Sequence, residues 1–463
     1  MNFTTDVIIG LEIHIQLDTR TKLFSASPTA KKKDTANSRC DVINLGMPGT
    51  KPRLNKEAIH KALKLCLATN CEIAPELVFS RKSYFYPDLS KNYQTTQYEM
   101  PLGEKGFITL MSGKKVNLTR IHVEEDPASL THPSGMDASK FVLIDYNRSG
   151  NPLCELVTEP EMYSPEEARD FLKQLIAILS YLKIFDNQNG IIKADANVSI
   201  KEKDYTRVEI KNITGFKELE RALNYEIERQ KTEDVVLETR GWDADQGITR
   251  SLRKKESEEE YGYILDPDIP VTEITQEMKD ACDIPEMPYQ KALRLIDEYK
   301  LTEEDAHIIA QSQALAHVFE KAIQTVSAST AVTWMRHELN RVLNYNKLEL
   351  EDIELNEEQM LVLMQMVEKK ELTENSAKKV LNKLVVEPID VKAFVEKEGL
   401  KAVSDKGALE GFCRAAIDAN PKVVEDYKSG NEKALNFLLG QVMRQTKGAA
   451  SPPELLEIIK SLI

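Results

Sequence analysis

Apolar and polar residues alternate with one exception along residues 9–18, IGLEIHIQLD. Because successive side chains of a β-strand point to opposite faces, this period of two predicts a strand with one buried face. Its polar face carries Glu12 and His14, and a carboxylate and an imidazole at this spacing can converge on one metal ion. An antiparallel strand also turns polar side chains to water, so a merely solvated face is the alternative interpretation.

Two later segments repeat the alternation and favour a binding face. Residues 193–200 and 206–211 each separate a polar from an apolar face, and the polar residues between them suit a hairpin loop. If all three segments lie in one sheet, a single surface displays acidic, basic and amide side chains together. Asn is depleted in strands, which argues against a face that is only solvated. The polar residues concerned are Lys193, Asp195, Asn197, Ser199, Arg207, Glu209 and Lys211.

Length and composition are those of a multidomain globular protein. The chain has 463 residues, so two or three domains are expected. Its six cysteines form no Cys-x-x-Cys pair, which argues against a disulfide framework. No apolar run approaches the roughly 20 residues that cross a bilayer, and the first residues lack the pattern of a secretion signal. We therefore expect a cytoplasmic protein without a membrane segment.

The net charge of −14 excludes a general attraction to nucleic acid. Any such binding must use a local basic patch. The charges of residues 401–463 are nearly balanced, so this end of the chain repels a polyanion least.

Secondary-structure patterns predict an α+β protein. Strand and loop patterns dominate up to residue 287, whereas helical periodicity replaces them from Pro288 onward, for example at 303–323 and 328–344. A linker at 387–391 leads into a tail of short helices. We therefore predict domains at 1–287, 288–387 and 388–463. The helices expected in the first domain cover about residues 57–69, 164–182 and 217–229, the second with Ser164 as its N-cap.

Two polar segments of the first domain are candidate binding loops. Residues 81–97 interleave basic and aromatic residues, which can stack on bases and neutralise phosphate, or can form a small aromatic core under a surface loop. Residues 122–126, HVEED, hold three adjacent carboxylates, which repel each other unless a cation offsets them. Mg²⁺ prefers such oxygen ligands, and a solvated turn is the alternative.

A series of short motifs runs through the whole chain in a fixed order. They are GLEIHIQL at 10–17, TKLFS at 21–25, RKSYFYPDL at 81–89, HVEED at 122–126, DYNRSGNPL at 145–153, DANVS at 195–199, VEIKN at 208–212, ETRGWD at 238–243 and GQVM at 440–443. Taken together, these motifs resemble the GatB family, which provides one of the subunits of the tRNA-dependent amidotransferase. The number and order of the motifs make the resemblance specific.

The resemblance implies a heterotrimer with a glutaminase and a small third protein as the other two subunits. The glutaminase frees ammonia from glutamine. The GatB protein uses ATP and Mg²⁺ to phosphorylate the side-chain carboxylate of Glu mischarged on tRNA(Gln), or of Asp on tRNA(Asn), and ammonia then displaces the phosphate. The implied fold is a β-rich antiparallel-sheet cradle that holds a kinase-like site, followed by a helical domain and a helical tail that contacts tRNA.

The chemistry of the polar residues agrees with that activity, because phosphoryl transfer depends on charge neutralisation and alignment. We expect Glu12, His14 and Glu125 around the metal, with Glu124 and Glu155 as further candidates. His14 is an unusual Mg²⁺ ligand and can instead orient a carboxylate. Lys193, Asp195, Asn197, Arg207 and Lys211 are expected to face the nucleotide or the acyl phosphate. Lys82 and Lys91 are candidates for the ammonia path or for substrate contact.

The chain departs from the family pattern at three places. Only Cys40 remains where many members carry Cys-x-x-Cys, Lys193 replaces an arginine, and Gly262 replaces another. A divergent, non-catalytic tRNA-binding scaffold of the same complex is therefore a competing hypothesis. A free-standing carboxylate–amine ligase is a third. The chain lacks the Walker, G-x-G-x-x-G and G-x-S-x-G motifs of other nucleotide-binding and hydrolytic enzymes.

Overall fold

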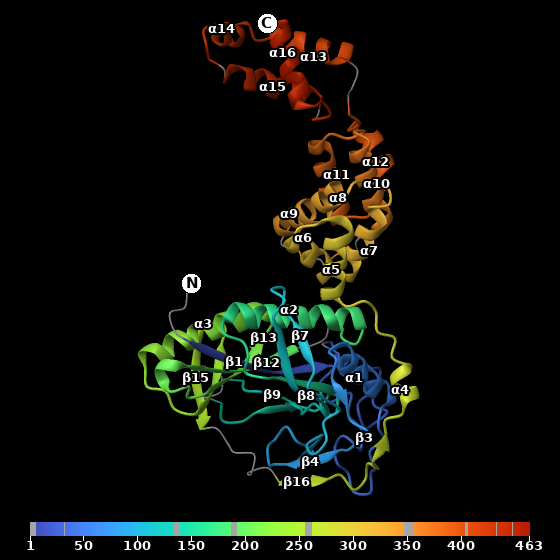
Figure 1. The fold of residues 1–463 in the computed structure, drawn as a ribbon, viewed down its shortest axis with the longest axis vertical. Helices are drawn as coiled ribbons and strands as arrows, with labels where there is room; N and C mark the ends of the chain where they lie inside the picture. Colours follow the sequence, from blue (N-terminus) through green and yellow to red (C-terminus); the bar gives the residue numbers. More distant parts are fainter. Residues whose placement is uncertain are drawn as a thin grey trace. The chain divides into compact units, whose positions relative to one another are not determined.

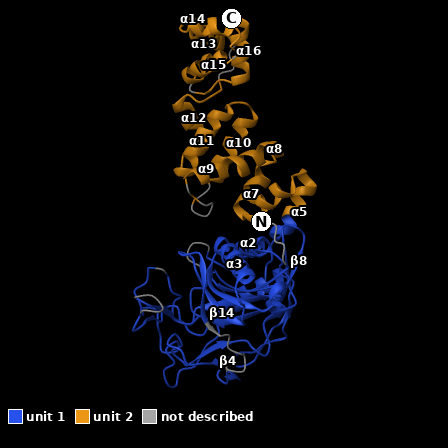
Figure 2. Ribbon diagram, turned by 90° about the vertical axis from the view of Figure 1, so that its left-hand side faces the viewer, with its two compact units in different colours: residues 1–291 blue, residues 292–463 orange. Residues whose placement is uncertain are grey.

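The protein folds into two compact units, residues 1–291 and 292–463 (Figure 2). The first is rich in strands and the second is helical, which confirms the predicted α+β class. The computed structural model describes residues 6–31, 33–133, 139–186, 192–254, 262–346, 348, 353, 356–402, 406–431, 433–446 and 448–463.

A ten-stranded sheet forms the centre of the first unit (Figure 1). Its order is β15-β14-β13-β12-β1-β11-β8-β6-β2, with β7 also paired to β8, and every pairing described in it is antiparallel except β13 with β14. The predicted strand at 9–18 is the central strand β1, and the predicted hairpin is β12–β13. The strands are β1 Val7–Gln16, β2 Glu72–Ile73, β6 Gly103–Glu104, β7 Phe107–Thr109, β8 Lys115–Glu125, β11 Pro152–Thr158, β12 Ile192–Ile200, β13 Val208–Thr214, β14 Glu238–Asp243 and β15 Ile248–Lys254.

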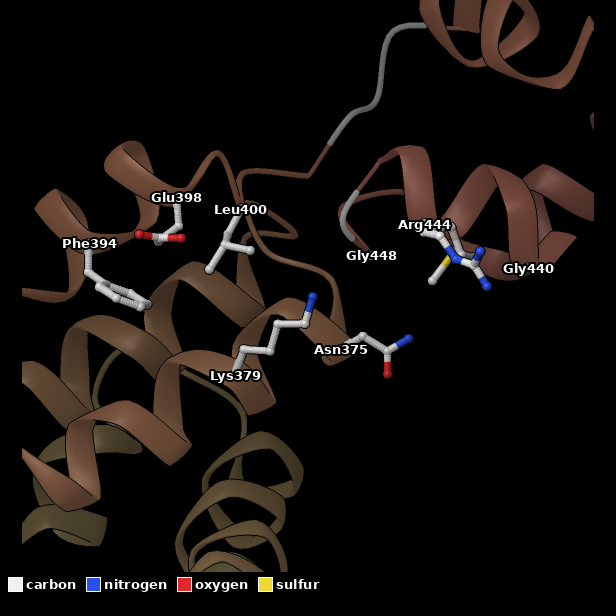
Figure 3. Close-up of a pocket in the computed structure, with 9 residues that line it drawn as sticks. Asn375, Lys379, Phe394, Glu398, Leu400, Gly440, Arg444 and Gly448 are labelled. Atoms are coloured by element: carbon white, nitrogen blue, oxygen red, sulfur yellow. The ribbon is translucent and has the colours of Figure 1, made fainter. Parts of the chain in front are cut away.

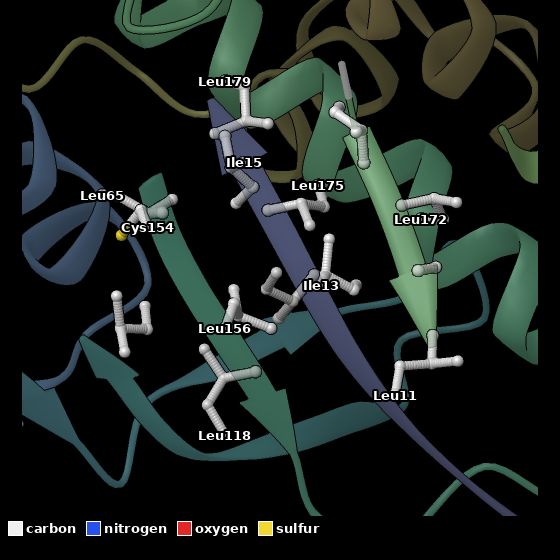
Figure 4. Close-up of a cluster of buried hydrophobic side chains, with 14 of the residues drawn as sticks. Leu11, Ile13, Ile15, Leu65, Leu118, Cys154, Leu156, Leu172, Leu175 and Leu179 are labelled. Carbon is white, nitrogen blue, oxygen red and sulfur yellow. The ribbon is translucent and has the colours of Figure 1, made fainter. Parts of the chain in front are cut away.

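Helices α1 (Lys56–Ala68), α2 (Pro165–Leu182) and α3 (Phe216–Thr232) pack on the apolar face of this sheet. Figure 4 shows the alternate apolar residues of β1 against Leu172, Leu175 and Leu179 of α2. All three helices confirm the sequence predictions, and Ser164 Oγ accepts a hydrogen bond from the Glu167 N–H at 3.2 Å, as expected of an N-cap. Because the apolar side chains of β1 face these helices, its polar side chains lie on the opposite face.

Smaller sheets border the large one. Strands β4 (Ser80–Ser83), β5 (Tyr93–Thr96) and β16 (Gly262–Leu265) form a three-stranded sheet. Arg81 in β4 lies over the Tyr93 ring and forms an ion pair with Asp266 at 3.0 Å, so part of the predicted basic and aromatic loop is packed. Phe85 of the same loop is 89% exposed. Two-stranded sheets pair β9 (Ser129–Thr131) with β10 (Leu143–Asp145) and β3 (Glu76–Leu77) with β17 (Thr272–Glu273), and the short helix α4 covers Gln276–Asp280.

The second unit contains two apolar clusters, one spanning Ala292–Leu400 and one spanning Leu409–Ile459. The predicted boundary at 387/388 falls inside the first cluster, because Val391 and Val395 belong to it. No helix among the described residues has the length and apolar character needed to cross a bilayer. The helices are α5 Pro288–Tyr299, α6 Glu303–Gln311, α7 Gln313–Ala322, α8 Ala328–Val332, a π-helical turn Thr333–Glu338, α9 Leu339–Asn346, α10 Glu357–Glu368, α11 Glu374–Val386, α12 Val391–Glu398, α13 Lys406–Asp418, α14 Pro421–Lys428, α15 Ala434–Gln445 and α16 Pro452–Leu462.

The helical pattern predicted at 303–323 corresponds to two helices, α6 and α7. Ser312 is extended, with φ −110° and ψ 121°, and separates α6 from α7. Its hydroxyl accepts a hydrogen bond from the Leu315 N–H at 3.3 Å, so the serine serves as the N-cap of α7. The helical periodicity of apolar residues continues across the break, which explains why the pattern alone missed it.

Candidate functional site

His14, Glu124 and Glu155 form a compact cluster on the polar face of the large sheet. They come from β1, β8 and β11, which are adjacent strands, and the β1–β11 register sets His14 directly opposite Glu155. His14 Nε2 lies 3.3 Å from Glu155 Oε2 and 3.7 Å from Glu124 Oε1. One ligand atom of each residue lies within 4.8 Å of the other two, a spacing at which a single ion can contact all three.

A cavity of about 390 Å³ opens beside this cluster. Its wall combines acidic, basic and amide side chains from five strands of the large sheet, from β4 and β5, and from the neighbouring loops. The lining residues are His14, Gln16, Lys82, Tyr84, Asp88, Gln94, Glu124, Asp126, Pro127, Arg148, Leu153, Glu155, Lys193, Asp195, Lys211 and Asn212.

The electrostatics of the cluster favour a positive charge between the carboxylates. Burial lowers the pKa of His14, but the hydrogen bond and charge of Glu155 outweigh it and raise that pKa to about 9. Burial likewise opposes ionisation of Glu155, but the nearby His122 and His14 lower its pKa below the usual range. A proton on His14 therefore occupies the position between the two carboxylates that a metal ion would fill.

The donor set fits a divalent cation. Two carboxylates and an imidazole are common ligands of Mn²⁺ and Zn²⁺, and the carboxylates suit Mg²⁺. His122 Nε2 lies 3.6 Å from Glu124 Oε2 and 3.7 Å from Glu155 Oε2, beyond hydrogen-bond distance. His122 Nδ1 and Asn197 Oδ1 are buried and have no hydrogen-bond partner among the described residues. Neither residue lines the cavity, and buried atoms left unpaired in this way are commonly paired with water.

Proton binding at His14 predicts a pH-dependent stability. Because folding raises the pKa of His14 from 6.5 to about 9, its stabilising effect is complete below pH 6.5 and is lost as the pH rises through 9. We expect the difference in unfolding free energy between the metal-free wild type and His14→Gln to shrink over that range. Urea unfolding from below pH 6.5 to above pH 9 measures it, and a constant difference would contradict the assignment.

A second group of charges lies on β12 and β13, next to the first. Lys211 Nζ lies 2.8 Å from Asp195 Oδ2 and 3.0 Å from Glu209 Oε1. Burial opposes protonation of Lys211, but these two carboxylates raise its pKa above the usual value. Asn197 donates a hydrogen bond to Glu12 Oε1 at 3.0 Å, and Glu12 lies opposite Asp195 in the β1–β12 register. Burial, with Glu155 and Glu209 nearby, raises the pKa of Glu12.

Lys193 lines the cavity and makes no ion pair with any residue that the structure describes. Burial and the nearby guanidinium of Arg148 lower its pKa below the usual value. The carboxylates of Asp126 and Asp195 lie near enough to oppose this shift, but they pair with Arg148 and Lys211. Lys193 can therefore receive an anionic group of a ligand.

The structure does not bring three of the predicted site residues into this group. Glu125 accepts hydrogen bonds from Lys91 Nζ at 2.5 Å and from the Thr95 N–H at 2.9 Å, and it does not line the cavity. Lys91 therefore lies next to Glu125 and is not part of the cavity wall, whereas Lys82 lines the cavity. Arg207 is exposed and immediately precedes β13.

Sequence reasoning gave Arg148 no role and treated Asp126 only as one of the adjacent carboxylates of HVEED, yet both residues line the same cavity. Arg148 Nε lies 3.2 Å from Asp126 Oδ1, and the guanidinium donates hydrogen bonds to the carbonyl oxygens of Pro127 and Ala128. Burial raises the pKa of Asp126 to about 6, although Arg148 opposes the shift. Both residues lie in motifs on which the family resemblance rests. The sequence therefore marked these positions but did not indicate what they do.

Two family models match the chain, one in its N-terminal part and one in its C-terminal part. The family model of the GatB/GatE catalytic domain matches residues 7–280, and that of the GatB domain matches residues 317–463. Curated relatives named as B subunits of aspartyl/glutamyl-tRNA(Asn/Gln) amidotransferase include those of Carboxydothermus hydrogenoformans, 39% identical over 98% of both chains, and Methanoregula boonei, 40% identical over 98% of this chain and 97% of that one. The Geobacillus kaustophilus relative is 40% identical over the same shares. With matches of this length and identity, the chain belongs to the GatB family, as its ordered motifs predicted.

Proposed function

We propose that this chain is the carboxylate-activating component of a cytoplasmic tRNA-dependent amidotransferase. It would phosphorylate the side-chain carboxylate of Glu on tRNA(Gln), of Asp on tRNA(Asn), or of both, with ATP and Mg²⁺. A glutaminase would supply ammonia, and a small third protein would complete the heterotrimer. The observation that carries the proposal is the cavity wall that joins the three potential metal ligands to the ammonium of Lys193.

In this proposal the two sides of the cavity have different functions. His14, Glu124 and Glu155 would hold the Mg²⁺ ion, which when bound neutralises charge on the phosphate oxygens. Lys193 places a positive charge beside a transferring phosphoryl group, the requirement that dominates such reactions. Lys211 is held between Asp195 and Glu209, so it orients these acidic groups rather than moving freely.

Lys82 and Lys91 take separate roles in the proposal. Lys82 lines the cavity and is placed for contact with the substrate. Lys91 pairs with Glu125, the residue next to Glu124 in the chain, and also lies 4.9 Å from the Tyr93 ring centroid. This pair is the candidate for the route by which ammonia approaches.

A cavity in the second unit supports tRNA contact by the C-terminal region (Figure 3). It has a volume of about 710 Å³, and Lys379 of α11 and Arg444 of α15 contribute cationic side chains to its wall. Gly440 and Met443 of the GQVM motif lie in the same wall. Local cations of this kind are the means by which a chain of net charge −14 can bind a phosphate backbone.

Transfer of labelled γ-phosphate from ATP to Glu-tRNA or Asp-tRNA in the reconstituted complex tests the proposal. We expect Lys193→Met to lower the transfer rate about 100-fold while tRNA affinity stays unchanged, because the lost charge acts on the phosphoryl group. Lys201→Met is the matched control, since Lys201 follows the same strand, is exposed and pairs with Asp6. Tight tRNA binding by the wild type without any phosphate transfer would instead favour the scaffold hypothesis.

A further inference from the structure

The C-terminal end of α1 brings two cysteines together. Thr69 caps the helix, Asn70 follows in the left-handed conformation with φ 57°, and the Cys71 N–H donates to the Cys66 carbonyl at 2.9 Å. The Asn70 N–H donates to the Leu67 carbonyl at 3.1 Å. These two bonds define a Schellman motif, which frequently brings together the side chains at the positions occupied here by Cys66 and Cys71.

Two glycine backbones enclose the pair. A Cβ atom at Gly103 would lie 2.9 Å from Cys66 Sγ and 2.9 Å from Cys71 Cβ, and one at Gly106 would lie 2.4 Å from Cys71 Sγ. All three distances are shorter than nonbonded atoms tolerate, so only glycine fits at these positions. The contacts at Gly103 show that both cysteine side chains lie next to the same residue.

The two thiols differ in the way that a reactive and a resolving cysteine differ. Cys71 is half-buried, and its contact with the Cys66 thiol lowers its pKa, with Thr69 contributing as well. Cys66 is fully buried, and burial raises its pKa. A more accessible thiol of lowered pKa beside a second thiol is the arrangement found in redox-sensitive cysteine pairs.

We infer that Cys66 and Cys71 are a redox modification site that forms a reversible disulfide when a hydroperoxide oxidises it. The Cys71 thiolate attacks one peroxide oxygen, the O–O bond breaks, and a sulfenic acid and hydroxide result. The Cys66 sulfur then attacks Cys71 Sγ, the S–O bond breaks, and water leaves with the thiol proton. Two thiols and one molecule of hydrogen peroxide thus yield one disulfide and two waters, and a dithiol reductant restores the pair.

Treatment of the full chain with hydrogen peroxide, followed by alkylation and trypsin digestion, tests the inference. No Lys or Arg lies between Lys64 and Arg81, so one tryptic peptide, residues 65–81, contains both cysteines. We expect this peptide to lose two hydrogen atoms and to resist alkylation until it is reduced. In Cys66→Ser, Cys71 should instead accumulate as a sulfenic acid that dimedone traps.

Cys282→Ser and Cys413→Ser are the matched controls, because each removes a buried thiol whose pKa burial raises and leaves the 66–71 pair intact. Both should form the disulfide as the wild type does. If Cys66→Ser fails to fold, Cys71→Ser serves in its place and should leave the unoxidised Cys66 fully alkylatable after denaturation. A wild-type peptide 65–81 that stays alkylatable at peroxide concentrations that oxidise exposed methionines would overturn the inference.

Discussion

Replacing Glu155 by Gln is expected to reduce magnesium-dependent phosphoryl transfer at least about 100-fold while tRNA binding stays intact. Glu155 stands between the two histidines of the cluster, with His14 Nε2 at 3.3 Å and His122 Nε2 at 3.7 Å, and Arg120 approaches its other oxygen at 3.6 Å. Glutamine preserves the size of the side chain but is a much poorer metal ligand. Transfer rates measured over a Mg²⁺ titration at saturating ATP check the result.

Two further variants make this test specific to the metal. Glu159→Gln changes a carboxylate just beyond the end of β11 that accepts a hydrogen bond from Thr119 Oγ1 at 2.7 Å, and it should leave the transfer rate unchanged. Glu125→Gln removes the partner of Lys91 in the pair assigned to the ammonia route, so any loss of phosphoryl transfer in this variant should not depend on the Mg²⁺ concentration. If the Glu155 and Glu159 variants behave alike, the metal cluster is not the reaction centre.

Glu226→Gln is expected to lower the free energy of unfolding of the first unit by about 3 kcal/mol. The Glu226 side chain is completely buried, and Arg229 Nη2 lies 2.6 Å from its Oε1. Thr249 Oγ1 donates to Oε2 at 2.7 Å, and Arg240 Nε lies 3.6 Å away. Removing the negative charge leaves two largely buried guanidinium groups with fewer counter-charges, which is the costly way to break a buried ion pair.

Glu228→Gln on the same helix is the control for this prediction. Glu228 is exposed and pairs with Lys231 at 2.8 Å, and exposed pairs of this kind contribute less than about 1 kcal/mol. Trp242 lies in β14 and Trp334 in the second unit, and the chain has two tryptophans. Urea unfolding followed by tryptophan fluorescence in a Trp334→Phe background therefore reports on the first unit. Equal losses in both variants would contradict the role of burial.

The sequence predicted which residues share the polar face of the sheet better than it predicted which of them lie closest together. The period of two along residues 9–18 predicted that Glu12 and His14 share one face. The same rule predicted a shared face for Lys193 and Asp195, and in the structure their strand lies next to that of Glu12 and His14. Pairing between strands cannot be read from alternation alone, yet the family resemblance led us to expect these segments in one site. The β1–β12 register confirms that Glu12 and Asp195 are neighbours.

The choice between Glu124 and Glu125 depends on a local irregularity. In β8, Arg120 pairs with Val157 and Leu118 with Thr158, so Thr119 is an extra residue on that strand. Such a bulge shifts the alternation, and Ile121 and Val123 become the buried apolar positions that follow it. Glu124 then shares the polar face with His122, whereas Glu125 points away. The alternation in Ile-His-Val-Glu-Glu already groups Glu124 with His122 and Glu125 with Val123. The three adjacent carboxylates made this difference easy to overlook.

The cavity wall also has a consequence for biosynthesis, because β1 is the first strand of the sheet to leave the ribosome and its partners follow much later. Glu12 meets Asp195 only after β12 has been made, and Lys211, which offsets Asp195 and Glu209, is later still. A nascent chain that ends before β13 therefore cannot assemble the balanced set of charges. Contacts between residues so far apart in the sequence form slowly, so we expect the cavity to be completed late in the folding of this unit.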